Sequence, residues 1–186
     1  MSPERSLPLG AATEALETLR GVPGRMERVE AAQPFVVVID FAHTPGSLDA
    51  ILRELSPLTS DGGGIITVFG SSGERDVAKR PLMGAATARQ SRLVIVTEDD
   101  SRNEDPASIF EQIAGGAEKA GKRRGDDLLI IPDRREAIAE AFRRATPGDV
   151  VLLAGKGHET WNMGPRGPEP WSDREVAEGL LRRQVR

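Results

Sequence analysis

The sequence predicts an α/β protein with a Rossmann-like, mostly parallel sheet of about six strands and helices on both faces. Short apolar segments rich in β-branched residues alternate along the chain with longer amphipathic segments. Such alternation is typical of consecutive β-α-β units, in which helices join parallel strands and cover the sheet. The apolar segments hold few polar residues, as expected for strands buried on both faces. The strands that can be placed span 35–40, 65–69, 93–97, 128–131 and 150–154.

Helix signals fill the segments between these strands. Thr44 and Pro45 supply an N-cap and a first-turn proline for a helix whose apolar stripe includes Leu48 and Leu52. Asp133 precedes a helix in the same way. The remaining helices are expected around 81–90, from 106 to about 120, and from a capping box at Ser172 and Glu175 to about 183.

The first residues differ from this regular pattern. Residues 11–20 predict a short helix that Gly21 ends, and residues 22–25 (Val-Pro-Gly-Arg) predict a turn-like linker. We therefore expect a lead-in helix and linker over residues 1–24 and the α/β domain over residues 25–186.

Composition narrows the class of protein. The chain has 186 residues, 38% hydrophobic and 29% charged, which is typical of one folded domain. A net charge of −4 disfavours a nucleic-acid-binding protein that relies on a basic surface, and no cysteine is present for disulfides, zinc thiolates or a thiol nucleophile. No apolar run is long enough to cross a membrane and residues 1–10 have no signal-peptide core, so a cytoplasmic protein without membrane contact is expected.

Charged and glycine-rich segments follow the expected strands. Because the carboxyl ends of parallel strands meet at one edge of a sheet, the segments after them should form a pocket there. Their glycines allow close approach, and their mixed charges suit a zwitterion such as an amino acid, whose carboxylate pairs with arginine and whose ammonium pairs with a carboxylate. These segments are 40–45, 70–81, 98–102 and 155–159.

Each feature also has a simpler explanation. Arg75 could pair with a neighbouring acid, Asp99 and Asp100 could stabilise a helix N-terminus, His43 could be an ordinary loop histidine, and 155–157 could be a plain turn. Two histidines with scattered acids do not make a convincing metal site. The chain contains no G-x-x-x-x-G-K-[ST] phosphate loop, no G-x-S-x-G elbow, and no G-x-G-x-x-G after the first strand, which argues against a dinucleotide-binding domain.

Several motifs together resemble a known family. The chain is similar, from about residue 22 to 183, to the C-terminal domain of the Mur ligases, specifically the MurE-type UDP-N-acetylmuramoyl-tripeptide synthetases. No single motif is specific, but their order and spacing together are. The matching segments are Gly-Arg-Met-Glu at 24–27, Asp-Phe-Ala-His-Thr-Pro at 40–45, Gly-Glu-Arg-Asp at 73–76, Lys-Arg-Pro-Leu-Met-Gly at 79–84, the acidic segment 98–102, and Ala-Gly-Lys-Gly-His-Glu at 154–159.

The resemblance implies an enzyme that joins an amino acid to a UDP-MurNAc-peptide using ATP and Mg²⁺. The substrate carboxylate is phosphorylated, and the amino group of the incoming residue attacks the acyl phosphate. Arg25 matches an arginine that reaches the ATP phosphates, where cationic charge stabilises phosphoryl transfer. Asp40 matches a contact to the nucleotide, and His43 is a weaker candidate in the same loop.

The resemblance also implies the contacts to the incoming amino acid. Arg75 matches an arginine that binds it, and Asp99, Asp100, Ser101 and Arg102 match a specificity motif that usually reads Asp-Asn-Pro-Arg in enzymes that add meso-diaminopimelate. Gly155 and Glu159 match contacts to the distal end of that residue.

This chain departs from the family pattern in two ways. The retained Arg102 favours a distal carboxylate, as in diaminopimelate, whereas the acid at position 100 favours an additional ammonium, as in lysine or ornithine, so the added residue stays open. The resemblance also implies an N-terminal UDP-sugar-binding domain and a central ATPase domain, which carries the phosphate loop and the Mg²⁺ ligands. Neither is in this sequence, so we expect an excised or fragmentary domain that holds no catalytic group or metal ligand and is inactive alone.

The alternative function is a stand-alone module that binds a nucleotide or an amino acid, or that regulates another ligase, without catalysis of its own.

Overall fold

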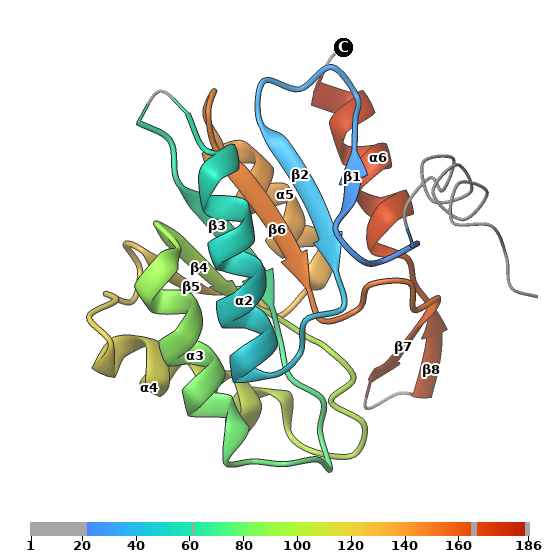
Figure 1. The fold of residues 1–186 in the computed structure, drawn as a ribbon. Helices are drawn as coiled ribbons and strands as arrows, with labels where there is room; N and C mark the ends of the chain where they lie inside the picture. The colour runs from blue at the N-terminus through green and yellow to red at the C-terminus, as the bar shows by residue number, and fades with distance from the viewer. Residues whose placement is uncertain (1–21, 61, 165–166, 185–186) are drawn as a thin grey trace, which may run out of the picture.

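A six-stranded sheet forms the centre of the domain, with strand order β1-β2-β6-β3-β4-β5 (Figure 1). The structure is a computed structural model that describes residues 22–60, 62–164 and 167–184. The short strand β1 (Glu27–Val29) pairs antiparallel with β2 at one edge, and every other pairing in this sheet is parallel. The parallel strands are β2 (Val36–Asp40), β3 (Ile65–Phe69), β4 (Leu93–Val96), β5 (Leu128–Ile130) and β6 (Val150–Ala154).

Helices cover both faces of the sheet, which confirms the predicted fold class (Figure 1). One apolar core joins one face of the sheet to α2, α3 and α4, and a second core joins the other face to α5 and α6. In the described part of the chain, no helix has the length and apolarity that crossing a membrane requires. The helices are α2 (Pro45–Leu55), the short 3₁₀ helix η1 (Ser56–Leu58), α3 (Lys79–Gln90), α4 (Pro106–Lys119), α5 (Arg134–Arg144) and α6 (Asp173–Gln184).

Two predicted helix starts are confirmed by their caps, whereas α3 begins at Lys79, two residues before the predicted start, and has no side-chain cap. The Thr44 side chain accepts a hydrogen bond from the Ser47 amide, which completes a capping box before α2. The Asp133 carboxylate accepts from the Glu136 amide at 2.9 Å before α5. These bonds satisfy amides that the first helical turn leaves without a partner.

Three strands were not expected from the sequence. β1 has only three residues, and two of them are charged, so it carries no apolar signal. The strands β7 (Trp161–Gly164) and β8 (Gly167–Pro170) form a separate two-stranded antiparallel sheet whose glycines and prolines disfavour a strand prediction. The helix expected over 11–20 lies outside the described residues.

The order of the sheet brings distant segments together. Helix α5 carries the chain back behind the sheet, and β6 then inserts between β2 and β3 (Figure 1). The loops that leave β2, β3 and β6 are therefore neighbours although β6 begins more than eighty residues after β3 begins. In open α/β sheets, ligands bind where the strand order reverses in this way.

At the amino-terminal ends of the parallel strands, opposite these loops, one buried acid, Asp149, joins neighbouring segments. Its Oδ1 accepts hydrogen bonds from the Gly64 amide at 2.8 Å and from Arg92 Nε at 2.9 Å. Its Oδ2 accepts from Arg92 Nη2 at 2.5 Å and from the Thr146 amide at 2.7 Å. Burial alone raises the pKa of Asp149, but these donors outweigh it and lower the pKa from 3.8 to about 2.

Replacing Asp149 with asparagine should lower the free energy of unfolding by about 2 kcal/mol at neutral pH. Because the folded pKa lies below the unfolded value, this carboxylate stabilises the protein above pH 4, and the contribution is lost as the pH falls from about 4 to about 2. Urea unfolding across that range should show a shallower pH dependence in the variant than in the parent. Asp126→Asn, at an exposed position, is the matched control; equal pH slopes in D149N and the parent would contradict the assignment.

Candidate functional site

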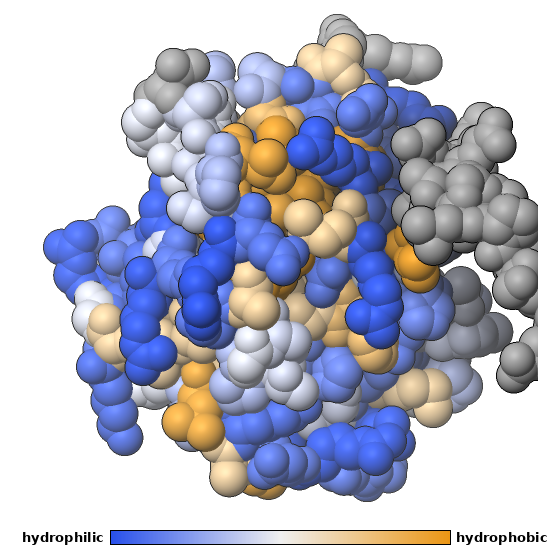
Figure 2. All heavy atoms as spheres, viewed as in Figure 1, coloured by the Kyte–Doolittle hydropathy of each residue, from blue (hydrophilic) through white to orange (hydrophobic). Residues whose placement is uncertain are grey.

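A pocket of about 540 Å³ lies at the carboxyl ends of the parallel strands. Figure 2 shows that the lower edge of this view is largely hydrophilic, whereas the most extensive apolar surface lies higher, beside β2. The pocket draws on each of the segments that the sequence analysis selected. Its lining comprises Phe41, His43, Thr44, Ser72, Arg75, Asp76, Lys79, Asp99, Asp100, Arg102, Gly155 and Glu159.

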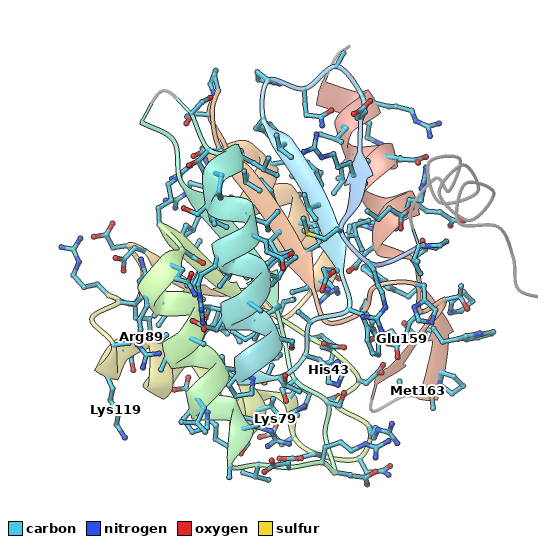
Figure 3. All side chains as sticks on the ribbon, in the orientation of Figure 1. His43, Lys79, Arg89, Lys119, Glu159 and Met163 are labelled. Atoms are coloured by element: carbon cyan, nitrogen blue, oxygen red, sulfur yellow. The ribbon has the colours of Figure 1, made fainter. Side chains whose placement is uncertain are left out.

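Side chains from separate elements meet at this edge. In Figure 3 His43, Lys79 and Glu159 lie together below the sheet, whereas Arg89 and Lys119 lie away from them. Lys79 donates a hydrogen bond to the backbone oxygen of His43 at 3.0 Å, which ties the start of α3 to the loop after β2. The predicted convergence of the loops is therefore confirmed.

A buried lysine, Lys156, occupies the centre of the acidic side of the site. Its side chain is fully buried. Its Nζ lies 2.5 Å from Asp100 Oδ1, 3.6 Å from Asp99 Oδ1 and 3.5 Å from Glu159 Oε2. It also donates to the backbone oxygen of Trp161 at 3.0 Å. A buried ammonium is costly unless it is paired, and here it has several partners.

The same carboxylates form a group that could ligate a cation. Ligand atoms of Asp99, Asp100 and Glu159 all lie within 4.8 Å of one another. The ammonium of Lys156 already neutralises this group, and a divalent ion would meet a positive charge within 3.6 Å of each acid. The donor set therefore does not fit Mg²⁺.

Asp99 is the most enclosed of these acids. Desolvation by burial raises its pKa, and the opposing attraction of Arg134 and Lys156 does not cancel that effect. Arg134 is itself buried, and it binds Asp173 through Nε at 2.8 Å and Nη2 at 2.7 Å. Its Nη2 also donates to the backbone oxygen of Ala154 at 2.9 Å, so α5, α6 and the end of β6 are joined behind Asp99.

Cationic side chains line the same pocket. Within the described residues, Arg75 is exposed and makes no hydrogen bond or ion pair. The Nε of Arg102 is buried without a hydrogen-bond partner. Burial lowers the pKa of Lys79 from its usual value, although Asp99 and Asp76 raise it. The pocket thus presents unpaired positive groups beside a neutralised acidic cluster.

The loop that carries Arg75 is held by Arg80, which the sequence analysis did not select. Arg80 is fully buried and forms two parallel hydrogen bonds to Glu104, at 2.5 and 2.7 Å. It also donates to the backbone oxygen of Ser72 at 3.2 Å. The hydrogen bonds from Arg80 lower the pKa of Glu104 to about 2. An arginine in the first turn of a helix carries no sequence signal of such burial.

The predicted nucleotide residues lie next to this pocket. The Arg25 guanidinium stands 5.9 Å from the ring centre of Phe41, which is 4.7 Å from the His43 ring and 5.6 Å from the His158 ring. Asp40 accepts hydrogen bonds from the amides of Met26 at 2.9 Å and Ala42 at 2.8 Å, so part of its capacity is used by the fold.

Two glycines allow the loop after β6 to pack closely against both the acidic cluster and the predicted nucleotide residues. Gly155 has φ +106°, and a Cβ there would lie 2.3 Å from Asp99 Oδ2. Gly157 has φ +52°, and a Cβ there would lie 2.8 Å from the Gly24 oxygen. Neither position accepts a side chain without displacement of its neighbours.

The structure also answers the simpler explanations. Arg75 makes no ion pair with Glu74 or Asp76. The next helix begins at Pro106, so Asp99 and Asp100 are not at its N-terminus. Of the predicted amino-acid-binding residues, Ser101 alone does not line the pocket; it is buried, and its Oγ has no hydrogen-bond partner. The binding roles of all these residues stay predictions.

Fold and site define a domain of the Mur ligase type. The family model described as Mur ligase, glutamate ligase domain matches residues 24–157. This match covers most of the chain, and the chain belongs to this family.

Similar proteins carry more specific names. A UDP-N-acetylmuramyl-tripeptide synthetase of Roseiflexus sp. (strain RS-1) is 52% identical over 94% of this chain and 34% of its own length. A UDP-N-acetylmuramoyl-L-alanyl-D-glutamate--2,6-diaminopimelate ligase of Syntrophomonas wolfei is 44% identical over 95% of this chain and 35% of its own. A solved structure of such a diaminopimelate ligase matches with a TM-score of 0.78 and 34% identity, over 97% of this chain and 36% of that one. The chain spans about a third of the length of these relatives.

Replacing Lys156 with methionine should destabilise the domain, because three close carboxylates lose their shared ammonium. We expect the free energy of unfolding to fall by about 3–5 kcal/mol at pH 7. The gap should narrow as the pH falls from 7 to 5, because burial raises the pKa of Asp99, loss of the ammonium raises it further, and a bound proton removes the repulsion. Urea unfolding at both pH values measures this, with Lys119→Met as the exposed control; a gap independent of pH would contradict the shared ion pair.

Proposed function

We propose that the chain is the amino-acid-recruiting C-terminal domain of an ATP-dependent ligase of peptidoglycan-precursor synthesis. The ligase adds the third residue, diaminopimelate or another diamino acid, to UDP-MurNAc-L-Ala-D-Glu. The observation that carries this proposal is the pocket itself, where free guanidinium groups and a carboxylate cluster face one cavity. The names of the relatives support the same reaction.

On this proposal, the amino acid lies between the two charged sides of the pocket. Arg75 and Arg102 bind carboxylate oxygens, because a guanidinium offers paired donors to that group. Glu159, whose side chain is partly exposed, receives an ammonium, while Asp99 and Gly155 shape the wall behind it. Asp100 and Ser101 follow Asp99 in the same loop and form the rest of that wall.

The nucleotide lies on the side of Arg25, Asp40 and His43. Arg25 is exposed and carries the positive charge that phosphate oxygens require. ATP binds between this surface and a central ATPase domain, and the Mg²⁺ ligands belong to that domain. The acidic cluster supports this division, because Lys156 already neutralises it.

The chemistry then depends on bringing two bound reactants together. The γ-phosphoryl group of ATP passes to a carboxylate oxygen of the UDP-MurNAc-dipeptide, and ADP leaves. The neutral amino group held by this domain then attacks the carbonyl carbon of the acyl phosphate, the bond from that carbon to the phosphate oxygen breaks, and the nitrogen loses a proton as the amide forms. The domain contributes orientation and the exclusion of water when it closes on the ATPase domain. Its partners are thus that domain and an N-terminal UDP-sugar-binding domain. On this proposal, residues 25–186 form the C-terminal domain of a cytoplasmic enzyme, and residues 1–24 connect it to the central domain.

In the complete ligase, Arg102→Ala should raise KM for the amino acid at least about tenfold, because a charged hydrogen bond to the substrate is lost. KM for ATP should stay within about twofold of the parent, since on this proposal Arg102 contacts the amino acid and not the nucleotide. Steady-state kinetics with each substrate varied in turn measures both. Arg89→Ala, on an exposed part of α3 away from the site, is the control. Equal increases in both KM values would remove Arg102 from its proposed role.

The 186-residue chain alone should bind ATP weakly or not at all, because the phosphate-binding loop lies in another domain. Isothermal titration of the chain with ATP and Mg²⁺ tests this expectation. Tight binding would instead favour a stand-alone nucleotide-binding module.

A further inference from the structure

Strand β7 lies across the loop 99–102 and is bonded to it. The Met163 amide donates to Asp100 Oδ1 at 2.6 Å, and the Arg102 amide donates to the Met163 backbone oxygen at 2.7 Å. The Asp100 amide donates to Asn162 Oδ1 at 3.3 Å. Met163 thus brackets the loop through both its backbone groups. The side chain of Met163 itself is exposed.

The loop that β7 holds has an unusual backbone. Asp100 has φ +52° and Arg102 has φ +56°, both in the left-handed region that residues with a Cβ rarely adopt. Such a conformation persists only where surrounding contacts impose it. The bonds from Met163 are contacts of that kind, and they fix the backbone from which the Arg102 side chain enters the pocket.

The Asp100 carboxylate links the amide of Met163 to the buried lysine, Lys156. Its Oδ1 accepts both from Lys156 Nζ, at 2.5 Å, and from the Met163 amide. Asp100 is 8% exposed and Lys156 is fully buried, so both bonds are shielded from water. The negative charge at position 100 is therefore balanced within the protein.

We propose that Asp100 is a positioning residue, which holds β7 and the backbone of Arg102 in place, and that it does not select substrates with an additional ammonium. This inference rests on the proposed function only for its kinetic part. It means that the acid at position 100 leaves the preference between diaminopimelate and lysine unchanged. Selection between them falls to the unpaired groups of the pocket, chiefly Arg75 and Arg102.

The first measurement is amide hydrogen exchange of the 186-residue chain by NMR. The readout is the Arg102 amide, because its acceptor is the Met163 backbone oxygen and not the altered side chain. In Asp100→Ala this amide should exchange at least about tenfold faster than in the parent, since β7 loses its charged anchor. Asp100→Asn keeps an oxygen for the Met163 amide and should retain most of the protection. Asp126→Asn is the control, and the Leu152 amide of β6 reports whether the fold is intact.

The second measurement is steady-state kinetics of the complete ligase with diaminopimelate and with lysine. In Asp100→Ala, KM should rise for both amino acids by the same factor, so that the ratio of the two kcat/KM values stays within about twofold of the parent. Asp100→Asn should restore both values toward the parent. A residue that reads an ammonium would behave differently: both variants would lose lysine and keep diaminopimelate.

The outcomes separate the two proposals. Unchanged exchange of the Arg102 amide in Asp100→Ala overturns the positioning role, and so does a loss confined to lysine. If Asp100→Ala does not fold, Asp100→Asn decides alone. The asparagine would lose an ionic contact to a substrate ammonium, but its oxygen would still accept the hydrogen bond from the Met163 amide. If the parent ligase uses none of diaminopimelate, lysine and ornithine, the proposed function fails, while the exchange measurement still decides the role of Asp100.

Discussion

The site depends on one buried ammonium. Lys156 leaves the end of β6 and meets Asp99 and Asp100, which leave the end of β4, together with Glu159 further along its own loop. Removing a charge from water is costly, so these groups are stable only while they remain together. The ion pairs therefore fix the spacing between two loops that belong to strands on either side of β3.

This arrangement also decides which charges the pocket offers to a ligand. The acids nearest Lys156 are balanced, whereas Arg75 and Arg102 make no ion pair within the described residues. Arg80 and Arg134 are different again: each is buried and bound by an acid, and each holds a loop at the edge of the site. Arginines that look alike in the sequence thus divide into those that support the loops and those that are free to bind.

The sequence was sufficient to predict the sheet, the helix starts and the edge where the site lies. Unbroken apolar runs such as 150–154 identify buried strands, and caps such as Thr44 locate helices, because both signals are local. The strands β1 and β7 were missed because packing, and not an apolar pattern, forms them. Lys156 belongs to one of the predicted site segments, but its role depends on Asp100, which lies 56 residues away in the sequence. Sequence spacing alone does not show that these two side chains meet in the fold.

The loop of residues 155–159 has a consequence for how ligands would affect each other. At one end Gly155 lies against Asp99, and two residues later Gly157 lies against Gly24 and Phe41. Only Lys156 separates the two glycines, and its ion pairs hold it in place, so the two contacts are connected through one fixed residue. A ligand bound beside Phe41 should therefore change the affinity for a second ligand bound beside Asp99. Thermodynamic linkage requires the second ligand to change the affinity for the first by the same factor.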